Sequence, residues 1–313
     1  MVDANELYDL TNHPDVLSRL QDDVGTLIDK TGIYFRIFGR IKTGVSIAEK
    51  LVRKGDKYGI GGFKMQDLLG IRIVLYYLDD IDICRNILRS HFHLIERDSQ
   101  VDLPESNDFS KVRMNLIFRL PREMAEAFPD ELWNDYPIDR TFEVQIRTTF
   151  SEGYHEVEHE VRYKHEQEWT SPNYYTYSRL LNSIYATLEM CDNTIIRILD
   201  DLAHEAYSEG DVEKMLRYKF RIRMENEHLS QPVLDAVHSR TVRQNIYLVD
   251  RAQFLSVISN SALLGVPLTA DNIIFLCGNI LFTSKRLQDL TPPDLAAQID
   301  TYKTRKSQRR KRR

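Results

Sequence analysis

Two cations precede a short helical pattern in Gly39-Arg-Ile-Lys-Thr-Gly-Val-Ser-Ile-Ala-Glu-Lys-Leu-Val-Arg-Lys54, the stretch that decides the fold of the first half of the chain. These cations are Arg40 and Lys42. Polar and basic side chains then recur at spacings of four and three, which places them on one helical face: Ser46, Lys50 and Arg53. The opposite face is apolar and is predicted to pack on a core through Val45, Ala48 and Val52.

A single carboxylate follows this cationic helix. Asp67 comes immediately before a β-rich run in Gln66-Asp-Leu-Leu-Gly-Ile-Arg-Ile-Val74, and Gly70 lets the chain bend or approach a ligand closely. Several cations beside one carboxylate suit a polyphosphate with its divalent metal ion. A basic helical face standing alone is more often only solvated, so the other segments decide between these interpretations.

The composition is that of an ordinary soluble protein that forms two domains, or one large domain with an appendage. The chain has 313 residues, of which 42% are hydrophobic and 28% are charged. The acidic N-terminus lacks an apolar run, so no secretory signal is expected. The longest apolar stretch, residues 273–282, is too short to span a bilayer. The three cysteines are far apart in the sequence and form no metal or redox spacing, so a cytoplasmic protein without a membrane span is expected.

The last eleven residues are positively charged, whereas the rest of the chain has a net negative charge. Residues 303–313 carry eight cations and no acid, while the whole chain has a net charge of −5, which leaves −13 for the remainder. Such a segment contacts RNA or another anionic surface, docks on the acidic face of its own chain, or is a disordered solubilising end.

Alternating patterns predict the strands of a sheet. Residues 69–77 form a run rich in Ile and Val with Arg72 as its only charge, and residues 111–120 alternate between a cationic and an apolar face. A further strand, residues 141–147, aligns Glu143, Gln145 and Arg147 on one side. Residues 5–30 are predicted to form two helices, and the chain beyond residue 150 is predicted to be helical. A core stripe is expected on residues 174–206, made of Leu180, Ile184, Leu188, Ile195 and Ile198.

His155-Glu-Val-Glu-His159 matches the H-E-x-x-H pattern of zinc peptidases, and His165 stands where some of these enzymes have a third ligand. Those enzymes have a glycine three residues after the second histidine, whereas this chain has Arg162. If the helix continues, His165 lies about 240° around it from His159, so the two cannot bind one metal ion. A chance match is the preferred interpretation.

Four segments in order resemble the synthetase domain of the RelA/SpoT family: residues 39–54, 67–74, 143–148 and 158–164. The resemblance covers about residues 30–170. It implies an α+β, nucleotidyltransferase-like mixed β-sheet flanked by helices, followed here by an all-helical C-terminal region. It also implies transfer of the β,γ-pyrophosphate of ATP to a ribose 3′-hydroxyl. The acceptors in the family include GDP or GTP, which gives alarmones, adenine nucleotides, and the 3′ end of tRNA in toxin members.

The resemblance assigns roles to residues of this chain. Asp67 and Glu143 resemble the residues that hold Mg²⁺, with Glu143 also activating the attacking hydroxyl. Residues that resemble the ATP-binding set are Arg40, Lys42, Ser46, Lys50, Arg53 and Arg72. Residues expected on the acceptor side are Phe109, Lys111, Arg113, Gln145 and Arg147. The family's Gly-Tyr-x-Ser-x-His acceptor motif is replaced by residues 108–113, with Phe109 where a tyrosine usually stacks on the base.

The sequence therefore predicts a synthetase domain at residues 1–172, a helical regulatory or assembly region at 173–302, and a basic, disordered tail at 303–313. The leading hypothesis is Mg²⁺-dependent alarmone synthesis from ATP and GDP or GTP. The alternatives are pyrophosphorylation of the tRNA 3′ end and a non-catalytic nucleotide-binding module. A homo-oligomer or an antitoxin is a further expected partner. The chain has no His-Asp motif of an alarmone hydrolase.

Overall fold

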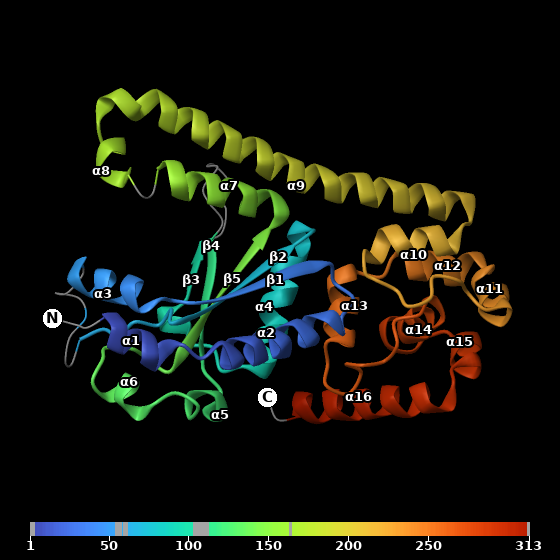
Figure 1. Ribbon diagram of the computed structural model, residues 1–313. Coiled ribbons are helices and arrows are strands. Elements are labelled where there is room, and N and C mark those ends of the chain that lie inside the picture. The colour runs from blue at the N-terminus through green and yellow to red at the C-terminus, as the bar shows by residue number, and fades with distance from the viewer. Residues whose placement is uncertain (1–3, 54–57, 59–61, 103–112, 163–164, 312–313) are drawn as a thin grey trace. The chain divides into compact units, whose positions relative to one another are not determined.

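The computed structural model describes residues 4–53, 58, 62–102, 113–162 and 165–311, which form two compact units (Figure 1). The first unit contains Met1–Thr26 and Phe35–Asp192, and the second contains Leu27–Tyr34 and Asn193–Arg313. The predicted boundary at residue 172 therefore differs from the structure in two ways. The first unit extends twenty residues further along the chain, and a short N-terminal segment belongs to the second unit.

The first unit is built on a mixed five-stranded sheet with the strand order β1-β2-β5-β4-β3. β2 pairs in parallel with β5, and the other three pairs are antiparallel. The strands are β1 (Phe35–Ile41), β2 (Leu69–Leu75), β3 (Gln100–Asp102), β4 (Arg113–Arg119) and β5 (Thr141–Thr148). The mixed sheet flanked by helices, followed by a helical region, confirms the predicted fold class.

Helices surround this sheet. They are α1 (Ala4–Thr11), α2 (Pro14–Asp29), α3 (Gly44–Arg53), α4 (Ile81–His91), α5 (Arg122–Ala125), α6 (Asp130–Asn134), α7 (Thr149–Val161), α8 (Glu166–Trp169) and the first part of α9 (Tyr175–Glu209). The predicted pair of N-terminal helices is confirmed. The second of them starts at Pro14, a residue well suited to the first helical position because it has no N–H to leave unpaired.

The two faces of the sheet differ in polarity. Phe142, Val144 and Ile146 of β5 are buried on one face, where the rings of Phe142 and Phe118 stack with centroids 5.5 Å apart. On the edge strand β1, Gly39 belongs to this face and α2 passes directly over it. A Cβ atom at Gly39 would lie 2.5 Å from Gln21 Oε1 and 3.0 Å from Leu17 Cδ1. The other face carries the polar side chains, because side chains alternate along each strand.

The second unit is helical around its own core, in which the rings of Phe220 and Phe254 lie 4.5 Å apart. Its helices, besides the rest of α9, are α10 (Val212–Phe220), α11 (Gln231–Val237), α12 (Arg240–Tyr247), α13 (Arg251–Ile258), α14 (Ala270–Leu276), a π-helical turn (Cys277–Leu281), α15 (Lys285–Leu290) and α16 (Pro293–Lys311). The segment Leu27–Tyr34 joins this unit through Gly32, whose carbonyl accepts a hydrogen bond from Arg223 N at 2.7 Å. None of the helices in the described part of the chain is long and apolar enough to cross a membrane.

Gly32 is required where it stands. Its φ of +70° is in the left-handed region, and a Cβ atom would lie 2.9 Å from the Arg223 carbonyl oxygen. Both the backbone conformation and the close approach of Arg223 therefore exclude other residues without strain.

The packing of α3 differs from the prediction. Gly44 and Ile47 are its buried residues, and α3 contacts α1. Val45 and Val52 lie about a third of a turn away from that face and are exposed, Val52 by 84%. The predicted apolar face was wrong because Ile47, which meets α1, sets the orientation of the helix.

Two further expectations from the sequence are corrected. Leu180, Ile184 and Ile198 were predicted to belong to the core stripe of α9, but they are exposed. The basic tail was predicted to be disordered, yet α16 continues to Lys311. Lys, Arg and Gln favour helix and the tail has no Gly or Pro, so nothing in it stops a helix that begins at Pro293.

A buried carboxyl connects α9 with the start of α7. Thr148 Oγ1 donates a hydrogen bond to Asp192 Oδ2 at 2.7 Å, and the same oxygen caps α7 by accepting from Ser151 N at 3.1 Å. Burial raises the pKa of Asp192 to about 6, and the charge of Glu189 adds to this rise. The folded protein therefore favours the protonated carboxyl.

Because the folded state binds this proton more tightly than the unfolded state, its contribution to stability is present below about pH 4 and is lost as the pH rises through about 6. We predict that the variant Asp192→Asn lacks this loss, which amounts to roughly 3 kcal/mol in the free energy of unfolding. Urea unfolding of both proteins at pH 4 and pH 7 measures it. Asp201→Asn, at an exposed position of α9, is the control. Equal pH dependence in wild type and Asp192→Asn would contradict the prediction.

Candidate active site

The polar face of the sheet forms the floor of an open cavity of about 620 Å³. Strands β1, β2, β4 and β5 contribute to the lining, and α7 contributes the rest. Strand register places the floor side chains in rows. Arg40 is opposite Gly70, which is opposite Glu143, and in the next row Phe38, Arg72, Gln145 and Asn115 are aligned. The residues from α7 are His155, Glu156, Glu158, His159 and Glu160.

Asp67 lies between two lysines beside this floor. Lys50 Nζ donates to both carboxylate oxygens of Asp67 at 2.9 Å, and Lys42 Nζ donates to Oδ2. Lys42 is held by the sheet, since its backbone N donates to the Leu68 carbonyl at 2.8 Å, whereas Lys50 comes from α3. The predicted cationic segment and the predicted carboxylate are therefore brought into direct contact, although they do not line the cavity themselves.

The lysines control the ionisation of Asp67. Burial opposes the charge on Asp67, but the charges and hydrogen bonds of Lys42 and Lys50 outweigh it, so the pKa of Asp67 is lowered. Burial also lowers the pKa of Lys42, in spite of the attraction of Asp67. The pKa of Lys50 is raised, because its contacts with Asp67 exceed the effect of burial. Asp67 is thus an anion at neutral pH.

The pKa of Glu143 is shifted in the opposite direction, upward. Burial raises its pKa and the negative charge of Asp67 raises it further, while a hydrogen bond from Gln145 Nε2 at 3.1 Å works against the rise. The repulsion between two neighbouring carboxylates can be relieved by a divalent cation that binds both. The donor set therefore fits Mg²⁺, which is bound through one or two carboxylates together with substrate phosphates.

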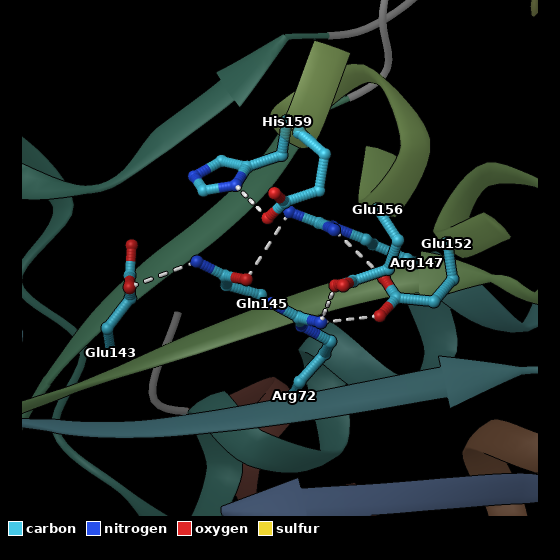
Figure 2. Close-up of polar contacts among 8 residues, drawn as sticks. Arg72, Glu143, Gln145, Arg147, Glu152, Glu156 and His159 are labelled. Atoms are coloured by element: carbon cyan, nitrogen blue, oxygen red, sulfur yellow. Dashed lines mark hydrogen bonds and ion pairs between the residues drawn. The ribbon is translucent and has the colours of Figure 1, made fainter. Parts of the chain in front are cut away.

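A network of arginines and glutamates occupies the other end of the floor (Figure 2). Glu152 of α7 bridges two strands, accepting from Arg72 Nη1 at 2.6 Å and from Arg147 Nη1 at 2.8 Å. Glu156, one turn further along α7, also accepts from Arg72. Arg147 Nη2 donates to Gln145 Oε1 at 3.3 Å, which links the network to Glu143 through Gln145.

Some predicted site residues lie elsewhere. Ser46 and Arg53 are exposed and do not line the cavity, and Ser46 N is bound to Thr43 Oγ1 at 3.2 Å as part of the turn that starts α3. Phe109 and Lys111 lie outside the described residues. Arg113 is the first residue of β4, and its side chain lies outside the described part of the structure.

Residues 158 and 159 of α7, which line the cavity, belong to a segment that carries the family resemblance, but sequence reasoning missed Glu152 and Glu156. Glu152 and Glu156 are four residues apart, so they share one face of a helix that begins directly after Arg147. That spacing next to a strand with arginines was a usable signal. Phe38 and Asn115 were also missed, and they could have been found only from strand register.

The three histidines of the zinc-peptidase pattern are not brought together at one point. α7 ends at Val161 with Arg162 as its cap, so the helix does not continue to His165. His155 is buried, whereas the side chain of His159 is 54% exposed and lies beside Glu160. Among the residues that the structure describes, no three His, Cys, Asp or Glu side chains are grouped to hold a metal ion.

Residues 39–168 match a family model described as "Region found in RelA / SpoT proteins". The match covers 130 of the 313 residues of the chain. GTP pyrophosphokinase YwaC of Bacillus subtilis (strain 168) is 26% identical to it over 129 residues, which cover 40% of this chain and 56% of that protein. The match thus spans little more than half of the relative's length.

Solved structures similar to this chain include small alarmone synthetase 1 of Bacillus subtilis bound to its product pppGpp. It is 20% identical with a TM-score of 0.47, covering 63% of this chain and 97% of that one. A GTP pyrophosphokinase family protein of Streptococcus pneumoniae is 17% identical with a TM-score of 0.46, covering 68% of this chain and 96% of that one.

The bridge that Glu152 makes between Arg72 and Arg147 can be tested by its effect on stability. Its side chain is 16% exposed and pairs with two arginines, whereas Glu156 is 62% exposed and pairs with one. We predict that Glu152→Gln lowers the free energy of unfolding by about 1 to 3 kcal/mol, because it leaves two partly buried arginines without their shared anion.

Glu156→Gln is the matched control and is expected to cost less than about 1 kcal/mol, since exposed ion pairs contribute little. Urea unfolding at neutral pH measures both. Equal losses in the two variants would show that the bridge does not hold the strands and α7 together.

Proposed function

We propose that the RelA/SpoT region transfers the β,γ-pyrophosphate of ATP to the 3′-hydroxyl of a guanine nucleotide. The 3′-oxygen bonds to the β-phosphorus, the bond from that phosphorus to the oxygen of the α-phosphate breaks, and AMP leaves. The observation that carries the proposal is the pair of carboxylates with opposite ionisation tendencies, Asp67 and Glu143, beside a cavity lined with cations. The name of the relative, GTP pyrophosphokinase, supports GDP or GTP as the acceptor. The cavity of about 620 Å³ is in the range that holds a small-molecule ligand.

Lys42 and Lys50 are suited to binding the phosphates of ATP. Phosphoryl and pyrophosphoryl transfer need little covalent chemistry from the protein, and depend on alignment and on stabilising negative charge. Both lysines form ion pairs with Asp67, so the fold already holds the two positive charges close together. A bound polyphosphate would interact with these same two lysines. Arg40 and Arg72 lie on neighbouring strands, and their planar guanidinium groups suit stacking on adenine.

Glu143 is suited to accept the proton of the attacking hydroxyl. A general base works best when its pKa approaches the working pH, and burial and the charge of Asp67 move the pKa of Glu143 in that direction. Mg²⁺, held by Asp67 and Glu143, would supply neutralisation of the phosphate charges. A non-catalytic module would not need two carboxylates arranged in this way.

A tRNA acceptor is the second candidate, and the basic end of α16 favours it. Lys303, Arg305 and Lys306 are exposed on this helix. Contacts between such side chains and phosphates release counterions and make binding depend on salt.

Replacing either carboxylate tests the reaction. We predict that Asp67→Asn and Glu143→Gln each reduce transfer by orders of magnitude while the fold is kept, because charge is lost and shape is not. ATP labelled at the γ-phosphate is incubated with GDP, GTP, ADP or bulk tRNA, and the labelled species is identified. Asp82→Asn, an exposed carboxylate on α4, is the control. Near wild-type transfer in either variant contradicts the site, and label on tRNA alone selects the second candidate.

The basic helix gives a separate prediction. Truncation after Tyr302, which is buried, should weaken binding of tRNA and flatten the dependence of its affinity on salt. Filter binding over a series of salt concentrations measures the slope. An unchanged slope would exclude phosphate contacts by residues 303–313.

A further inference from the structure

A largely apolar stripe with coiled-coil spacing runs along α9, and all of its residues are exposed except Cys191, which is half-buried. Its residues follow one another at alternating intervals of three and four: Tyr177, Leu180, Ile184, Thr187 and Cys191. The exposed fractions of Tyr177, Leu180 and Ile184 are 58%, 56% and 52%.

A different face of α9 holds the helix on the first unit. Tyr185 and Asp192 are buried there, with the ring of Tyr185 5.1 Å from that of Tyr154 and Asp192 bound to Thr148. Ile184 and Cys191 each precede one of these residues by one position, so the stripe is turned from the anchored face by about a third of a turn. The stripe is therefore not needed to attach α9 to its own unit.

α9 as a whole is rich in exposed apolar side chains, and the stripe contains three of them, Tyr177, Leu180 and Ile184. Of the sixteen large apolar side chains that are exposed within the described ranges, six lie on α9. Charge is scarce on the same stretch. Residues 175–188 contain one charged side chain, Arg179, in a chain in which 28% of the residues are charged. A long exposed segment that is apolar and nearly uncharged is typical of a surface that becomes buried.

We propose that α9 pairs with α9 of a second copy of the chain, through this stripe, as a two-stranded coiled coil. Alternating intervals of three and four are the spacing at which two helices pack side chains of one into gaps of the other. The partner surface is thus a helix with the same spacing, and α9 of another copy supplies it. Two-fold pairing of identical surfaces is the commonest form of soluble homo-oligomer.

Charge and length agree with this partner. Identical helices bring like charges together, and the near absence of charge between residues 175 and 188 removes that repulsion. From Tyr177 to Cys191, all within the first unit, the seam extends about 21 Å, or two heptads. Thr187 and Cys191 are smaller or more polar than the Leu and Ile of the strongest seams, so the dimer dissociates on dilution.

Sedimentation equilibrium of the full-length protein over a wide concentration range tests the proposal. Wild type is expected to approach twice the mass of one chain as the concentration rises. Leu180→Glu and Ile184→Glu each place a charge in the seam and are expected to weaken association at least tenfold. Both positions are exposed in the single chain, so the folded protomer is expected to keep its circular dichroism spectrum and its unfolding midpoint.

Asn182→Glu is the matched control, because it adds the same charge to an exposed position of α9 outside the stripe. It is expected to associate like wild type. A wild-type protein that stays monomeric at every concentration overturns the proposal, and so does a dimer that both stripe variants leave unchanged. Weakening of the dimer by Asn182→Glu to the same extent would also contradict it, since the effect would then be one of charge alone.

Discussion

Parallel pairing of β2 with β5 aligns Gly70 with Glu143 and Arg72 with Gln145, and the polar floor of the cavity depends on this alignment. Side chains alternate along a strand, so a shift of one residue in this register would turn Glu143, Gln145 and Arg147 to the apolar face. The stack of Phe142 on Phe118 on that face opposes such a shift, because it would carry buried rings into the cavity. The apolar core thus fixes the position of the carboxylate and arginines on the other side of the sheet.

The charges of the cavity are balanced within the protein itself. Lys42 and Lys50 share Asp67, and Arg72 and Arg147 share Glu152. A carboxylate binds the N–H edge of a guanidinium group, whereas an aromatic base stacks on its face, so the proposed stacking of adenine on Arg72 is compatible with its contacts to Glu152 and Glu156. These contacts restrain the Arg72 side chain, so less side-chain entropy would be lost when a base stacks on it.

The sequence predicted much of this sheet because strand patterns are local. In β5, apolar residues alternate with Glu143, Gln145 and Arg147, and this pattern is visible within eight residues. The association of Lys42 and Lys50 with Asp67 was expected because the segments that contain them resemble, in the same order, those of a known family. Other features depend on distant partners. Periodicity shows that α3 has an apolar face, but only the presence of α1 determines that Ile47 is buried and Val52 is not. In the same way, Leu180 and Ile184 form a stripe that the sequence could not distinguish from a core.

The anchored face of α9, beside that stripe, contacts the helix that holds the arginines of the site. Tyr185 and Asp192 of α9 contact Tyr154 and Thr148, the residues at and near the start of α7. α7 in turn carries Glu152, which holds the two floor arginines. Because packed interiors transmit small displacements rather than absorb them, ordering of α9 also orders the first turn of α7. A contact on the exposed face of α9 is therefore connected to the arginines of the cavity through α7, and its effect on them is expected to be stabilising.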